Sequence, residues 1–141
     1  MTHVDILGQE AMAEAIASDK LTIVDFWAEW CGPCRMLAPV LHALVEKYSY
    51  GVQSAKVDVD SEPNQPLAMQ YGVSSIPQVT FFRSGQKVDQ FVGVQSPEAI
   101  EEMIQKHLSS GVGMLQKTPE AIMEEGAAAQ TPEDQASSVG D

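Results

Sequence analysis

The two cysteines of this 141-residue chain, Cys31 and Cys34, are separated only by Gly32 and Pro33. A segment rich in β-branched and aromatic residues ends just before them, and a helical pattern of apolar residues follows them. A C-x-x-C pair placed between a strand and a helix is a redox signal. The chemistry to consider first is therefore thiol–disulfide exchange.

The start of a helix gives the two cysteines different roles. Thiolate is the reactive form of cysteine, and the free N–H groups and dipole of a helix N-terminus stabilise negative charge. Pro33 suits the first turn, where no N–H donor is needed. We expect Cys31 to be exposed and to attack as the nucleophile. We expect Cys34, one turn further in and more buried, to resolve the mixed disulfide.

Two simpler interpretations of the cysteine pair are less favourable. A tetrahedral zinc site would need two further ligands, and His3, His42 and His107 are at spacings that do not suit one. We therefore expect no metal. A purely structural disulfide is also disfavoured, because closing so small a loop removes little entropy from the unfolded chain.

The elements that position the pair follow from the residue pattern. Segment 21–27 (LTIVDFW) is almost wholly apolar, as in a strand covered on both faces, and Asp25 interrupts it. Ser84-Gly85 indicates a hairpin, and Ser96-Pro97 the start of a helix. The patterns predict helices over 9–18, from the cysteine pair to 48, over 65–71 and from 96, and strands over 21–27, 52–59, 78–82 and 87–92. This order predicts an α/β fold, a central mixed β-sheet flanked by helices on both faces.

Charge and hydropathy exclude several kinds of partner. The net charge is −12 and no basic cluster exists, so we expect no binding to nucleic acid or to an anionic membrane. No run approaches the roughly 18 apolar residues of a membrane span, and no targeting pattern is visible, so we expect a cytoplasmic protein. Composition changes after 110, which predicts a domain over 1–110 and an acidic, flexible extension over 111–141 with one short helix over 118–125.

Residues 24–36 (VDFWAEWCGPCRM) resemble the active-site segment of the thioredoxin family almost letter for letter. The resemblance spans roughly 4–108 and continues in 38–39, 56–60, 71–73, 76–77, 81–82, 84–85 and 92–93. It implies the thioredoxin fold and a protein-disulfide reductase that works through Cys31 and Cys34. It also implies recycling by a thioredoxin reductase, client proteins with exposed disulfides, a monomeric state, and no bound cofactor beyond the redox-active disulfide.

The resemblance also implies roles for matching residues. Asp25 matches a buried carboxylate with a raised pKa that moves a proton for Cys34. Lys56 matches a lysine near this carboxylate, although a strand lysine that only extends its ammonium to solvent is the simpler interpretation. Trp30 matches an exposed aromatic beside the nucleophile, and Trp27 a ring packed under the site. The matches that line the substrate groove are Ile76, Pro77 in the position of a cis-proline, Val92 and Gly93.

Departures from the family pattern concern substrate preference and direction. Ser75 stands where glycine is usual and Gln78 where threonine is common, and both flank the proline loop. Arg35 replaces a frequent lysine and keeps its charge. Gly32-Pro33 lacks the histidine that oxidising relatives usually have, which favours a reductase over an oxidase or isomerase. The alternative outside enzymes is a binding module that does not depend on redox turnover, and the extension motivates it.

Overall fold

The computed structural model of the chain describes residues 2–112. The chain divides into two units, Met1–Ile104 and Gln105–Asp141. All strands of the described residues belong to the first unit, and the last helix continues into the second as far as Val112. Residues 113–141, which include the short helix expected at 118–125, lie outside the described part of the chain.

Five strands form one mixed sheet in the order β1-β3-β2-β4-β5. The strands β1 (His3–Asp5), β3 (Val52–Asp58) and β2 (Leu21–Trp27) pair in parallel. The strands β4 (Gln78–Arg83) and β5 (Gln86–Val92) complete the sheet with antiparallel pairing. The predicted mixed sheet is confirmed, and each predicted strand is found with its ends shifted by no more than one residue.

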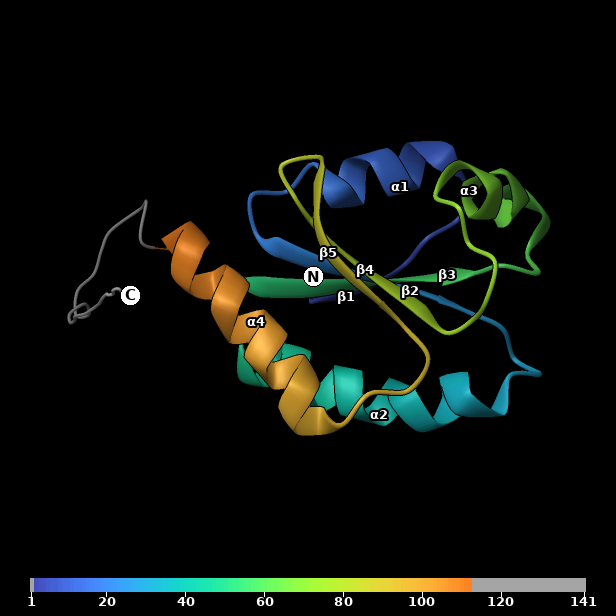
Figure 1. Ribbon diagram of the computed structural model, residues 1–141. Helices are drawn as coiled ribbons and strands as arrows, with labels where there is room; N and C mark the ends of the chain where they lie inside the picture. The colour runs from blue at the N-terminus through green and yellow to red at the C-terminus, as the bar shows by residue number, and fades with distance from the viewer. Residues whose placement is uncertain (1, 113–141) are drawn as a thin grey trace. The chain divides into compact units, whose positions relative to one another are not determined.

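Helices cover both faces of this sheet, as predicted (Figure 1). On one face lie α1 (Gln9–Ile16) and α3 (Gln65–Gln70), and on the other lies α2 (Gly32–Lys47). The last helix, α4 (Pro97–Val112), begins with the hydroxyl of Ser96 accepting the N–H of Ala99 at 3.1 Å, the expected N-cap. Within residues 2–112, no helix combines the length and apolar content that crossing a bilayer requires.

The burial of the central strands explains the continuous apolar runs in the sequence. Strand β2 is buried at every position except its last, and β4 likewise, so both appear as continuous apolar runs. Phe26 and Phe81 are among the largest fully buried side chains. The hairpin between β4 and β5 turns through Ser84 and Gly85 with φ of 52° and 82°, positive at both positions as its tight geometry requires.

Two short elements were not predicted, the strand β1 and the 3₁₀ turn η1 (Glu62–Asn64). The side chain of Asn64 connects them and is completely buried. Its Nδ2 donates to the carbonyls of Ile6 at 2.9 Å and Asp58 at 3.2 Å, and its Oδ1 accepts the N–H of Gly8 at 2.8 Å. Asn64 therefore holds the chain after β1 against the C-terminal end of β3, where the loop that contains Asp60 begins.

Asn64→Ala should lower the free energy of unfolding by about 3 kcal/mol, because it leaves one buried and two partly buried backbone groups without their partner. Urea denaturation followed by circular dichroism measures the change. Gln70→Ala, on the exposed end of α3, is the matched control and should change stability by less than about 0.5 kcal/mol. Equal stabilities for the two variants would show that Asn64 does not hold the chain after β1 against the end of β3.

Candidate active site

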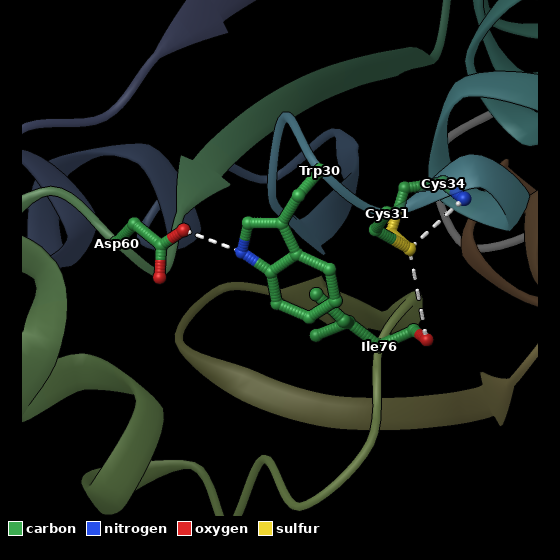
Figure 2. Close-up of a disulfide and its surroundings, with 5 residues drawn as sticks. All are labelled: Trp30, Cys31, Cys34, Asp60 and Ile76. Atoms are coloured by element: carbon green, nitrogen blue, oxygen red, sulfur yellow. Dashed lines mark hydrogen bonds between the residues drawn. A yellow bond between two sulfur atoms is a disulfide. The ribbon is translucent and has the colours of Figure 1, made fainter.

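Cys31 and Cys34 form a disulfide at the start of α2, with their Cα atoms 5.3 Å apart. Cys31 is the N-cap residue, and its Sγ accepts the N–H of Cys34 at 3.2 Å (Figure 2). Pro33 lies in the first turn, where its missing N–H leaves no helical hydrogen bond unmade. The pair therefore lies at the predicted junction between a strand and a helix.

The expected exposure of Cys31 is wrong for this disulfide form. The exposed fraction is 4% for Cys31 and 2% for Cys34, so burial hardly distinguishes the two cysteines. They cluster with buried Ala28, and the partly buried Trp27 and Ile76 pack against them. The difference between the cysteines lies in their position on α2, because only Cys31 has its sulfur at the free N–H groups.

The loop before β4 faces the disulfide. The Ile76–Pro77 peptide bond is cis, as the resemblance implied, and the carbonyl oxygen of Ile76 lies 3.9 Å from Sγ of Cys31 (Figure 2). The carbonyl of Pro77 accepts the N–H of Gly93 at 2.8 Å, and Val92 beside it is half-exposed. Gly93 has φ of 84°, and an added Cβ would meet no atom within 4 Å. Within this chain its conformation, not crowding, requires the glycine.

Trp30 is the exposed aromatic side chain that the resemblance implied, with 70% of its surface accessible. Its Nε1 donates to Oδ2 of Asp60 at 2.6 Å, and Figure 2 shows the ring between Asp60 and the disulfide. A hollow of about 490 Å³ runs beside the ring, along Val59, Ser75 and Ile76. Sequence analysis missed Asp60. It lies within segment 56–60, which matches the family pattern, but no role was assigned to it.

The two residues that depart from the family pattern lie in different surroundings. Ser75 is exposed and lines the hollow beside Trp30. Gln78 is buried in β4, where its Nε2 donates to the carbonyl of Tyr71 and to the hydroxyl of Thr80, both at 3.4 Å. Of the two, only Ser75 is on a surface that a substrate can contact.

Asp25 is buried in the middle of β2, opposite Lys56 of β3. Within residues 2–112, its Oδ1 is a buried side-chain atom with no hydrogen-bond partner. Desolvation raises the pKa of this carboxyl to about 6, against the opposing effect of the Lys56 charge. The ammonium of Lys56 lies 4.5 Å from the centre of the Trp27 ring, which holds it beside the site by a cation–π contact.

A cavity of about 280 Å³ separates Asp25 from α2. Lys56 lines it from the sheet, and Ala38 and Pro39 line it from the helix. Ala38 lies one turn after Cys34 and therefore on the same face of α2. The helix face that carries Cys34 thus closes the cavity into which Asp25 opens, and the cavity has ample volume for water.

Comparison with known proteins shows which family the chain resembles. Residues 3–106 match the family model described as Thioredoxin. The chain is 45% identical over 104 residues to a thioredoxin of Chlamydia muridarum, covering 74% of this chain and 98% of that protein. It is 43% identical over 95 residues to thioredoxin 1 of a Nostoc species, covering 67% and 87%. The structure of a mutant thioredoxin from Halobacterium salinarum superimposes with a TM-score of 0.68 at 36% identity, covering 74% of this chain and 88% of that one.

The mixed sheet with a C-G-P-C disulfide at the start of α2 defines a thiol–disulfide oxidoreductase. The chain belongs to the thioredoxin family, and its activity is the reduction of protein disulfides.

Asp25→Asn should remove a loss of stability that sets in as pH rises. A pKa of 3.8 in the unfolded chain and about 6 in the folded chain means that the folded state binds the proton more tightly. The contribution of Asp25 to wild-type stability therefore falls between about pH 4 and pH 6 and stays low above that range, by about 3 kcal/mol in all. The stability of Asp25→Asn relative to wild type should rise by that amount over the same range.

Urea denaturation at a series of pH values measures this difference. The control, Asp19→Asn, removes an exposed carboxylate in a turn, so its stability relative to wild type should not vary in the same way. A flat difference for Asp25→Asn would contradict a raised pKa for this carboxyl.

Proposed function

We propose that Cys31 and Cys34 reduce client disulfides in two exchange steps. The thiolate of Cys31 attacks one sulfur of the client disulfide, the other client sulfur leaves as a thiolate, and a mixed disulfide forms. Cys34, as a thiolate, then attacks Sγ of Cys31, and the second client thiolate leaves. Two electrons have passed to the client, its two thiolates take up protons, and the Cys31–Cys34 disulfide remains.

The hydrogen bond from the N–H of Cys34 to Sγ of Cys31 carries the assignment of the nucleophile. At 3.2 Å it already reaches the sulfur in the disulfide form. When Cys31 is a thiolate the same bond becomes charge-assisted and stronger, and the helix dipole adds to it. The sulfur of Cys34 lies inside the first turn and lacks this position, which suits a residue that reacts second.

Asp25 is the proton acceptor that we propose for Cys34. A carboxyl with a pKa of about 6 is ionised near neutral pH and still basic enough to take a thiol proton transiently. The cavity below the Cys34 face of α2 gives a water molecule room to relay that proton. Lys56, held over Trp27, keeps a positive charge beside the carboxylate and limits the rise of its pKa.

The client binds, in our proposal, as an extended segment across the surface around Cys31. The carbonyl of Ile76, the strand end at Val92-Gly93 and the loop held by Pro77 offer backbone groups on one side. The exposed indole of Trp30 offers an apolar contact on the other. Main-chain contacts bind many sequences, which suits a reductase that acts on different clients.

The remaining parts of the cycle complete the proposal. A thioredoxin reductase returns the Cys31–Cys34 disulfide to the dithiol, and the chain needs no bound cofactor or nucleic acid for its own steps. We place it in the cytoplasm as a monomer that meets its clients by diffusion and does not bind membranes. The net charge of −12 supports this, since it disfavours binding to nucleic acid and anionic lipid.

Replacing each cysteine separately tests the two roles. Cys31→Ser should abolish reduction of a disulfide-containing test protein, because no thiolate remains at the helix start. Cys34→Ser should still attack but should accumulate a mixed disulfide, which non-reducing electrophoresis and mass spectrometry detect. If Cys31→Ser trapped the client and Cys34→Ser did not, the two roles would be reversed.

Asp25→Asn should slow resolution of the mixed disulfide by about a hundredfold near neutral pH, the usual contribution of a general base. The first attack by Cys31 should be nearly unchanged, because Asp25 serves Cys34. Rapid-quench kinetics with a fluorescent disulfide peptide separates the two steps, and Asp19→Asn is again the control. Equal slowing of both steps would indicate a structural role for Asp25 instead of a proton transfer.

A further inference from the structure

A second cluster of chemically active side chains lies on the α2 face of the sheet, away from the cysteines. His3 comes from β1, and His42 and Glu46 come from α2 at a spacing of one helical turn. Among the described residues, these three side chains form a group able to hold a metal ion. We propose that His3, His42 and Glu46 bind a divalent transition-metal ion of the zinc type, with water as the fourth ligand.

The donor set suits such an ion. Two imidazoles and one carboxylate, with one open position, are an established combination for zinc, and imidazole binds the neighbouring metals nickel and copper as well. Magnesium and calcium prefer sites built from oxygen alone, so the two histidines disfavour them. The site therefore selects its ion by ligand type before geometry is considered.

The three ligand atoms already lie within 4.8 Å of one another. Nε2 of His3 is 2.8 Å from Oε2 of Glu46, and the His3 and His42 rings stack with centroids 4.0 Å apart. Tetrahedral zinc needs ligand atoms about 3.3 Å apart, so limited side-chain adjustment brings the three to that spacing. His42 and Glu46 are exposed on the helix and free to make that adjustment, whereas His3 is partly buried.

His3 is the fixed ligand because a second contact orients its ring. β1 pairs with β3 so that His3 lies directly beside Ser54, and Nδ1 of His3 is 2.8 Å from the Ser54 hydroxyl. A metal on Nε2 requires the ring proton on Nδ1, and the hydroxyl oxygen can accept it there. Such an outer contact fixes both the tautomer and the ring plane of a ligating histidine.

A simple ion pair does not account for the whole cluster. It explains the contact between His3 and Glu46, but it gives no reason for His42 to lie against the same ring. The His3–Glu46 pair and His42 together supply the three ligands that such a site requires.

Isothermal titration calorimetry with zinc chloride tests the proposal on the full, untagged chain near neutral pH. The disulfide form is used, so that Cys31 and Cys34 offer no thiolate to the metal. We expect one zinc ion per chain, and His42→Ala should weaken its binding by at least about tenfold. His107→Ala removes a histidine that is not one of the three ligands, and it should bind zinc as wild type does.

A positioning variant separates the proposed site from nonspecific binding by acidic residues. Ser54→Ala keeps all three ligands and should weaken zinc binding by about tenfold, because the His3 ring loses its orientation. Zinc should raise the Tm of wild type and of His107→Ala, but not that of His42→Ala. Equal zinc affinity in wild type and His42→Ala, or no binding by wild type, would overturn the proposal. Neither outcome bears on the activity of the cysteines.

Discussion

The pairing of β2 with β3 on one edge and β4 on the other is the constraint on which the site depends. With both edges hydrogen-bonded and helices on both faces, every side chain of β2 except Trp27 is buried. A carboxylate in such a strand loses its hydration, which is why the pKa of Asp25 is raised. The strand also ends at Trp27, so the chain leaves the sheet close to the point where Cys31 begins α2. Strand β2 therefore determines both the burial of Asp25 and the point at which the chain reaches Cys31.

Burial of the disulfide has a consequence for recognition. In the disulfide form only 4% of Cys31 is exposed, so the surface around the cysteine pair is formed largely by its neighbours. Trp30 is 70% exposed, and its bond to Asp60 fixes the ring without covering it. An aromatic surface held in place loses little entropy when a client binds, so it contributes affinity more efficiently than a free side chain. In the proposed binding mode, Asp60 therefore acts on the client through Trp30.

The fold was predictable from the sequence wherever burial is two-sided or an element is long. Strand β2 gave a continuous apolar run, and helix α2 gave apolar residues at helical spacing. Strand β1 has three residues and gave none, since its existence depends on pairing with β3 and on Asn64 far along the chain. The position of Cys31 between a strand and a helix was predictable from these two patterns. Its burial was not, because the loop at Ile76 that packs against it is distant in sequence.

The histidines show the same limit of sequence reasoning, and they also bear on how the two ends of α2 interact. Spacing along the chain made His3 and His42 look unrelated, whereas sheet register and helix packing bring their rings together. His42 lies eight residues after Cys34, about 12 Å along the helix. Physiological salt screens exposed charges over about 8 Å, so a cation at His42 has little effect on Cys31 across the surface. The cavity offers a less screened path, because His3, His42 and Asp25 all line it. Any electrostatic effect of a bound cation on the redox site would therefore be exerted on Asp25 first and on the sulfurs only through it.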